Sequence, residues 1–187
     1  MYIYLLQKYN SKYIKMITVG LLVNNMNVFT NGCIQQAFYI QDLFTNSNCV
    51  DCRLLTTLPD TNELERYKKV SKITDKTDFM EYDVIIYVSL VLNGISSLDK
   101  MYIDFLKENS IKIVNLICGN VFTLYQEEIV FGVHNIISTH VHASELVDEI
   151  WTLEMYGYSK DFLHLFFRKP VRILPYVWND FVINKYI

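Results

Sequence analysis

The chain has 187 residues, of which 51% are hydrophobic and 20% are charged, a balance typical of a globular domain and not of a disordered or fibrous chain. Its formal net charge of -3 and its scattered Lys and Arg residues argue against a nucleic-acid-binding surface, which requires a basic stripe. No apolar run approaches the roughly 18 residues of a membrane span, and Tyr2–Leu6 is too short for the apolar region of a signal peptide.

These exclusions predict a cytoplasmic protein without a membrane span, in which the four cysteines are reduced thiols. Alanine is rare, whereas Asn, Ile, Lys, Tyr and Phe, which have A/T-rich codons, are abundant. This bias indicates an A/T-rich genome, such as that of a large DNA virus or a parasite. For a viral protein, the expected compartment is the host cytoplasm.

Strand and helix patterns alternate along the chain. Apolar, β-branched segments without a helical stripe predict strands at 16–25, 49–58, 82–90, 111–117, 147–153 and 171–175. Apolar residues that recur at three and four positions predict helices from Gly32 to the Asn46–Asn48 turn and at 97–109, 121–131 and about 159–167. The polar stretch 59–78 is expected to be a connection.

Alternating strands and helices, with strands that are apolar throughout, predict a parallel sheet covered on both faces. Right-handed crossovers would make it an α/β, doubly wound, Rossmann-like domain with a mostly parallel sheet. We expect this domain to span residues 15–180, with 1–14 as an extension and 181–187 as a tail.

Asn and Gly stand side by side after the first and fourth predicted strands, as Asn31-Gly32 and Gly119-Asn120. In parallel α/β sheets, ligands bind at the carboxyl ends of strands, where helix N-termini offer free N–H groups. Glycine permits a close backbone approach or a positive φ, and the Asn amide pairs well with hydroxyl groups. The two pairs indicate either a binding cleft or strand-to-helix turns in which Asn is a helix cap.

Other candidate residues are less specific. Cys49 and Cys52 form a C-x-x-C in a predicted strand, where positions three apart point to opposite faces, which favours ordinary thiols. His140 and His142 share one side of an extended segment but have no third ligand at the usual spacing, so no metal site is predicted.

Glu127 is either an acceptor for sugar hydroxyls or a structural partner, and Trp178 is either a sugar-stacking residue or a packed hinge residue. Trp151 is expected in the core. No P-loop, G-x-G-x-x-G, G-x-S-x-G or kinase signature is present, which disfavours dinucleotide oxidoreductase chemistry.

Four blocks in this order resemble a family of glycosyltransferase-like proteins with members in bacteria and giant viruses: 30-TNGCIQQAFYIQDLF-44, 112-KIVNLICGNVFTLYQEEIVF-131, 149-EIWTLEMY-156 and 171-VRILPYVWND-180. The resemblance covers about Lys15 to Asp180. The positions that match its motifs are Asn31, Gly32, Gln35, Cys118, Gly119, Asn120, Glu127, Trp151, Thr152, Pro170, Arg172, Pro175 and Trp178.

The resemblance implies a GT-B arrangement, in which two Rossmann-like halves enclose the active site, and this chain looks like the amino-terminal, acceptor-side half. Residues 181–187 would then begin the linker to an absent second half, or the chain would act as a homo-oligomer. Glu154-Met155-Tyr156 and Tyr176 stand where imidazole-containing motifs are expected, so the catalytic base is unassigned.

The implied function is transfer of a sugar from a nucleotide-sugar donor to a glycan or protein acceptor, without a cofactor or metal and with no activity of this half alone. The alternative is a non-catalytic carbohydrate- or nucleotide-binding module, and a third reading is an assembly role. The residues expected at the substrate site are Asn31, Gly32, Gln35, Gly119, Asn120, Glu127 and Trp178.

Overall fold

The computed structural model describes residues 16–23, 32–58, 65, 68–88, 97–120, 122, 130 and 146–175. Within these residues, one sheet has the strand order β3-β2-β1-β4-β5-β6-β7, and every neighbouring pair is parallel. The strands are β1 (Ile17–Leu22), β2 (Val50–Thr56), β3 (Val70–Lys72), β4 (Val84–Val88), β5 (Lys112–Ile117), β6 (Glu149–Leu153) and β7 (Val171–Leu174).

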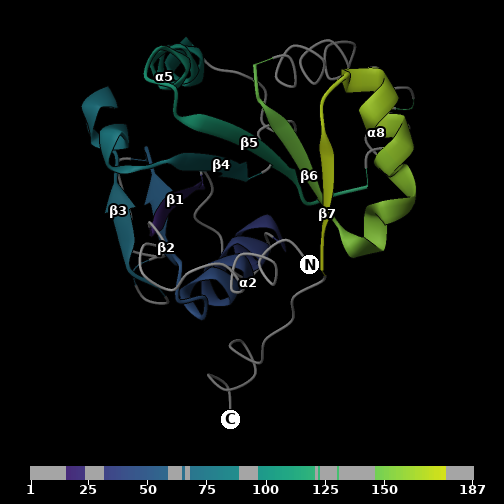
Figure 1. Ribbon diagram of the computed structural model, residues 1–187, viewed down its shortest axis with the longest axis horizontal. Coiled ribbons are helices and arrows are strands. Elements are labelled where there is room, and N and C mark those ends of the chain that lie inside the picture. Colours follow the sequence, from purple (N-terminus) through teal and green to yellow (C-terminus); the bar gives the residue numbers. More distant parts are fainter. Residues whose placement is uncertain are drawn as a thin grey trace, which may run out of the picture.

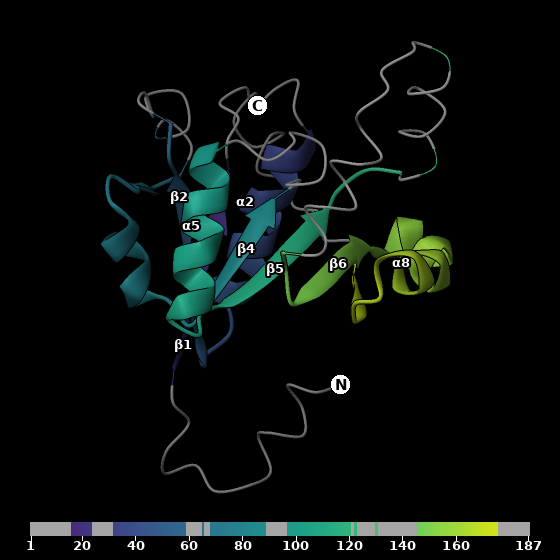
Figure 2. The same ribbon diagram turned by 90° about the horizontal axis from the view of Figure 1, so that it is seen from above.

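Helices lie on both faces of the sheet (Figure 1). They are α2 (Gly32–Thr45), α5 (Ser97–Glu108) and α8 (Lys160–Phe167), with 3-10 helices η1 (Lys76–Glu81) and η2 (Glu154–Ser159). Figure 2 shows α5 and α8 on the near side of the sheet, with β5 and β6 visible between them and α2 behind the strands. The chain is therefore a three-layer α/β domain of Rossmann-like type.

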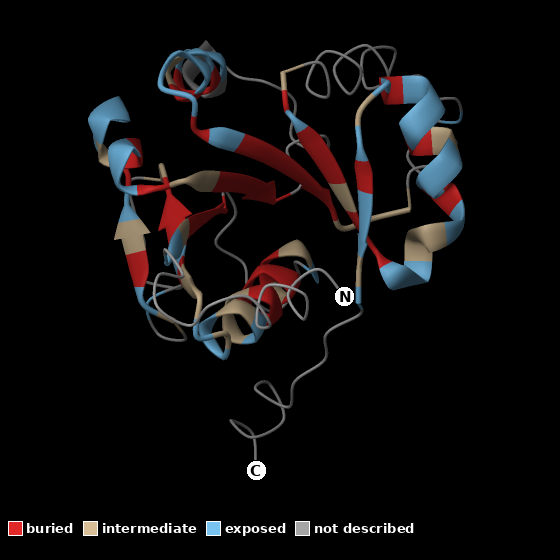
Figure 3. Ribbon diagram, in the orientation of Figure 1, coloured by how far each residue is buried: buried red, intermediate tan, exposed pale blue. Residues whose placement is uncertain are grey.

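The core has one apolar layer on each face of the sheet. On the α2 face, strand residues such as Leu21 and Ile86 pack with Phe38 of α2. On the opposite face, Ile85 and Ile113 pack with Leu106 of α5, and the same cluster extends to α8. The central strands β1, β4, β5 and β6 are mostly buried from both sides, whereas the edge strands β3 and β7 are partly exposed (Figure 3). Burial on both faces explains why the central strands are mainly apolar and do not alternate regularly with polar residues.

The predicted α/β, Rossmann-like fold is confirmed, and each of the six predicted strands is present. The structure corrects the prediction at 59–78, where the expected connection contains β3 and η1. β3 has only three residues, Val-Ser-Lys, with one buried position, so it is too short to show a strand pattern. The helix predicted at 121–131 lies outside the described residues except for Phe122 and Val130, which are both helical.

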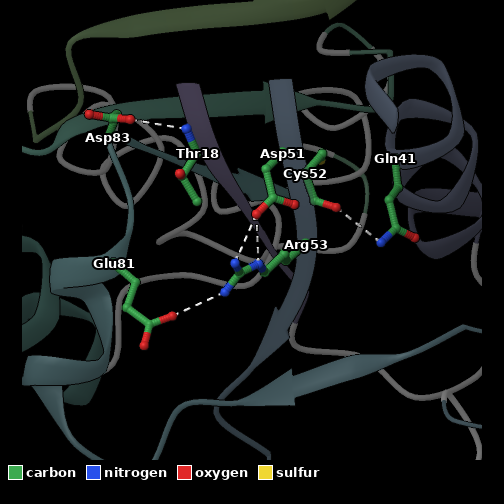
Figure 4. Close-up of polar contacts among 7 residues, drawn as sticks. All are labelled: Thr18, Gln41, Asp51, Cys52, Arg53, Glu81 and Asp83. Atoms are coloured by element: carbon green, nitrogen blue, oxygen red, sulfur yellow. Dashed lines mark hydrogen bonds and ion pairs between the residues drawn. The ribbon is translucent and has the colours of Figure 1, made fainter. Parts of the chain in front are cut away.

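Two aspartates close the amino-terminal edge of the sheet. The Asp83 carboxylate accepts a hydrogen bond from the Thr18 backbone N–H at 3.0 Å (Figure 4), and the Asp83 N–H donates to the Thr18 carbonyl at 2.9 Å. Asp148 repeats this arrangement with Ile113, at 2.7 Å and 2.8 Å. These backbone groups are therefore already hydrogen-bonded within the protein, and at these two positions the aspartates stabilise the amino edge of the sheet.

Glu149 is a buried carboxylate on the α2 face of the sheet. It accepts hydrogen bonds from Lys112 Nζ at 2.7 Å and from Trp151 Nε1 at 3.0 Å, and Arg172 Nε lies 3.6 Å away. Burial raises the pKa of Glu149, but these hydrogen bonds and the two positive charges outweigh burial and hold the pKa below its ordinary value of 4.5. Trp151, expected in the core, is half-buried here.

The Glu149 network predicts an acid-sensitive contribution to stability. Because the folded-state pKa lies below the unfolded one, the stabilisation is complete above the ordinary Glu pKa and is lost as the pH falls through the folded-state value. Urea unfolding between about pH 6 and about pH 3 should show a smaller loss for Glu149→Gln than for the unmodified chain. Equal losses in both proteins would contradict this role of Glu149.

Within the part of the chain that the structure describes, no helix combines the length and the apolar character that crossing a membrane requires.

Candidate functional site

The strand order defines a topological switch point beside β1. From β1 the chain proceeds to β2 and β3 on one side, then crosses to β4 on the other side of β1. The connections that leave β1 and β4 therefore run in opposite directions along the sheet. In open α/β sheets, ligands bind at such a switch point, in the crevice outside the carboxyl ends of the strands. The connections themselves, 24–31 and 89–96, are outside the described residues.

The two predicted Asn/Gly pairs, Asn31-Gly32 and Gly119-Asn120, are here called corners, and they follow strands on either side of this point. Gly32 is the first residue of α2, which follows β1, and Gly119 and Asn120 follow β5, the strand beside β4. Because all strands are parallel, β1 and β5 end at the same, carboxyl edge of the sheet, and each corner follows one of these strands. Asn31, Glu127 and Trp178, also predicted at the site, fall outside the described residues.

Neither glycine is required by its local structure. No described atom lies within 4 Å of the position that a Cβ would take at Gly32 or Gly119, and neither residue has a φ in the left-handed region. Gly20 in β1 is different, because a Cβ there would lie 2.8 Å from Ile85 Cδ1 and even closer to Leu55 Cδ1. The two corner glycines therefore leave open space at the carboxyl edge.

Asn120 has the geometry of a helix cap. Its Oδ1 accepts a hydrogen bond from the Phe122 backbone N–H at 3.0 Å, which is the capping interpretation of the Gly-Asn pair. This bond uses only the oxygen of the side chain, so the Nδ2 group stays available as a donor. Capping and ligand binding are therefore compatible functions of this residue.

Two glutamines lie within the first turns of α2. Gln35 is half-buried, whereas Gln36 is only 8% exposed and its buried Oε1 has no hydrogen-bond partner among the described residues. Gln36 is four positions after Gly32, so both lie on one face of the helix. Sequence reasoning selected Gln35 from the family motif and missed Gln36.

Asn115 and Thr152 are buried polar residues on the face covered by α5 and α8. Asn115 is in register with Tyr87 and Ile150, and Thr152 is in register with Ile117 on the same face. Both are 0% exposed, and neither amide group of Asn115 nor Thr152 Oγ1 has a partner within the described structure. An unpaired buried polar group costs about 1 to 3 kcal/mol, so these positions are expected to lower the stability of the fold.

The cysteines do not form a reactive pair. Cys49 precedes β2 in a turn, contrary to its predicted place in the strand, and its Sγ lies 3.0 Å from Ser47 Oγ. Cys52 is buried in β2, where burial and, secondarily, the Asp51 charge raise its thiol pKa to about 12. Among the described residues no three His, Cys, Asp or Glu side chains are grouped to hold a metal ion, and His140 and His142 lie outside them.

We use the term rim site for Gly32, Gln36, Gly119 and Asn120 at the carboxyl edge. These residues are uncharged, and they offer amide donors and acceptors together with the N-terminus of α2, whose first turn has no acidic residue. Such a surface binds hydroxyl and other neutral polar groups through hydrogen bonds.

The chain is thus a Rossmann-like domain with uncharged polar residues at the carboxyl edge of its sheet, beside the topological switch point. Residues 16–187 match the family described as "Protein of unknown function (DUF2827)", and the chain belongs to that family.

No match was found to a curated protein. Among solved structures, the chain is similar to the crystal structure of an AraC family transcriptional regulator from Pseudomonas putida, with 10% identity, a TM-score of 0.40 and coverage of 86% of this chain and 77% of that chain. A similarity this distant carries no argument about function.

Proposed function

We propose that the domain binds a sugar-bearing ligand at the rim site, as the acceptor-side half of a glycosyltransferase-like protein of GT-B type. The observation that supports this proposal is the combination at one edge of two glycines with open Cβ positions and the Asn120 side-chain amide. Open space beside the backbone admits a flat or hydroxylated ring, and the amides supply its hydrogen bonds.

Sugar hydroxyls both donate and accept hydrogen bonds, so they match the chemistry of this site. Asn120 Nδ2 donates to a hydroxyl, and the first N–H groups of α2 donate to another oxygen. In this proposal the chain positions the acceptor, and a second half supplies the nucleotide-sugar donor. Positioning of this kind is a large part of the catalysis of group transfer.

A non-catalytic carbohydrate- or nucleotide-binding module is the second candidate. It is favoured by the described residues directly after β1 and β5, Val23 and Cys118–Asn120, none of which is a carboxylate or an imidazole. A general base for transfer would have to come from elsewhere. Both candidates use the same rim site, and an assay of donor turnover distinguishes them.

Asn120→Asp separates the two functions of Asn120. The variant keeps the oxygen that caps Phe122 N–H and loses the amide donor, so the melting temperature should not fall while sugar affinity drops about tenfold, the value of one hydrogen bond. Asn120→Ala should lose the same affinity and in addition about 0.5 to 2 kcal/mol of stability.

The measurement is calorimetric titration of the full chain with a panel of nucleotide sugars and free sugars. Saturable binding that Asn120→Asp weakens supports the proposal, and turnover of a nucleotide sugar would select the transferase over the binding module. The absence of heat with every sugar and nucleotide sugar would reject both.

A further inference from the structure

Two exposed aromatic side chains lie beside the rim site, outside the residues assigned to it. Phe122 is 37% exposed and Tyr158 is 65% exposed. Their ring centroids are 6.2 Å apart and their planes differ by 17°, so the rings are nearly parallel. This separation exceeds the spacing of about 3.5–4.0 Å between carbon atoms in contact, so the rings are offset and each leaves part of its face uncovered by the other.

The sheet topology places this aromatic pair at the carboxyl edge. β6 is the parallel neighbour of β5, and η2 follows β6 directly, so Tyr158 lies in the segment next to the Gly119-Asn120 corner. Phe122 links the two segments, because its N–H donates to Asn120 Oδ1 while its ring contacts Tyr158. The aromatic pair therefore continues the rim site along the sheet toward β6.

The backbone of η2 holds Tyr158 in place without burying its ring. Tyr156 packs against the core on the α2 face of the sheet, and its carbonyl accepts a hydrogen bond from the buried Ser159 hydroxyl at 2.7 Å. A Cβ at Gly157 would lie 3.2 Å from Ile173 Cδ1, so β7 packs closely against the η2 backbone. A backbone fixed on both sides of Tyr158 lowers the entropy cost of binding a ligand at its exposed ring.

Phe122 is supported in a similar way. Its ring contacts Phe162 of α8 at a centroid distance of 5.0 Å, and Phe162 packs against the core on the opposite face of the sheet. The two exposed rings are therefore the outer end of a packed aromatic row and not isolated surface side chains.

An exposed aromatic pair beside the Asn120 amide matches the chemistry of a carbohydrate. The ring carbons of a sugar form an apolar C–H face that packs on an aromatic ring, and its hydroxyl groups pair with amides. A nucleotide fits less well, because its phosphates require cationic partners. The rim site is uncharged, and η2 contains one carboxylate, Glu154, and no cation, so the described residues favour a neutral glycan.

We propose that Phe122 and Tyr158 form a second sugar subsite, in which Tyr158 stacks on the ring next to the one bound at the rim site. This inference rests on the proposed function, and it narrows the acceptor to a glycan of at least two sugar rings. One ring binds beside Gly119 and Asn120 through its hydroxyl groups, and its neighbour lies on the aromatic pair. A monosaccharide fills only the first position.

The test is calorimetric titration of the full chain with glucose, galactose, mannose and N-acetylglucosamine, and with the disaccharides cellobiose, maltose, lactose, mannobiose and chitobiose. At least one disaccharide should bind about tenfold more tightly than its component monosaccharides. No binding of any saccharide would reject the rim site and the subsite together. Saturable binding with equal affinity for monosaccharides and disaccharides would overturn the subsite alone.

Variants of Tyr158 assign the gain to its ring. Tyr158→Ala should remove the tenfold gain and leave monosaccharide affinity unchanged, whereas Tyr158→Phe, which keeps the ring, should keep the gain. Leu165→Ala is the matched control, because Leu165 is an apolar residue of α8 that is 76% exposed and lies outside the aromatic pair, and it should change neither affinity. Thermal unfolding verifies that each variant is folded.

Two results would contradict the assigned ligand. An equal loss of monosaccharide and disaccharide affinity in Tyr158→Ala would place Tyr158 in the rim site itself and not in a second subsite. Binding of uridine or adenosine that Tyr158→Ala weakens, without a change in disaccharide affinity, would assign the aromatic pair to a nucleobase.

Discussion

Replacing Gly119 with Ala is expected to leave the fold intact and to lower sugar affinity at least about tenfold, whereas replacing Gly20 with Ala should destabilise the fold by about 1 to 3 kcal/mol. The two substitutions add the same methyl group. They differ in what that methyl group meets, which is open space at one position and packed side chains at the other.

The stability difference follows from the surroundings of each glycine. At Gly20 the new methyl group would overlap Leu55 and Ile85, which are both fully buried and cannot move into solvent. At Gly119 it would contact no described atom, and the backbone is not left-handed, so Ala should be neutral or slightly stabilising by reducing the entropy of the unfolded chain.

The binding difference follows from the open space itself. If a sugar ring lies against the backbone at Gly119, a methyl group there takes the volume that the ligand needs. Thermal unfolding and calorimetric titration of Gly119→Ala, Gly32→Ala and Gly20→Ala measure the two effects separately. Unchanged sugar affinity in both Gly119→Ala and Gly32→Ala would remove the reason for placing the ligand beside these residues.

Thr152→Val should raise the free energy of unfolding by about 1 to 2 kcal/mol in the absence of ligand. The Thr152 hydroxyl is fully buried and has no partner among the described residues, so the native state bears its desolvation cost without a compensating hydrogen bond. Valine has nearly the same shape and no polar atom, so it removes the cost without leaving a cavity.

Thr56→Val is the matched control. Thr56 is also 0% exposed, but its Oγ1 accepts a hydrogen bond from the Leu58 N–H at 3.2 Å. Its replacement should therefore lower stability by about 1 kcal/mol. Urea unfolding of both variants checks the comparison, and destabilisation by Thr152→Val as large as that by Thr56→Val would show that Thr152 has a partner in the folded chain.

The layer architecture was predictable because it depends on a repeated pattern. The segment 111–117 is apolar at five of its seven positions, a composition typical of a strand that is buried on both faces. β3 was not predictable, since a three-residue edge strand is held by its pairing to β2 and not by its own composition.

The candidate site was predictable only in part. Gly32 and the Gly119-Asn120 pair were identified because residues between a strand and a helix lie at the carboxyl edge of any parallel sheet. Asn115 was missed since it stands inside an apolar strand, where sequence does not show whether a partner exists. Gln36 differs from Gln35 only in its burial, which depends on how α2 packs on the sheet.

The most direct measurement is an NMR titration of the isotope-labelled chain with the nucleotide sugar or free sugar that gives the strongest calorimetric signal. The account predicts that the backbone amide signals of Gly32, Gly119 and Asn120 shift on binding, whereas those of Asp83 and Asp148 at the opposite edge do not. Shifts confined to the amino edge, or no shift at the three carboxyl-edge residues, would contradict the rim site.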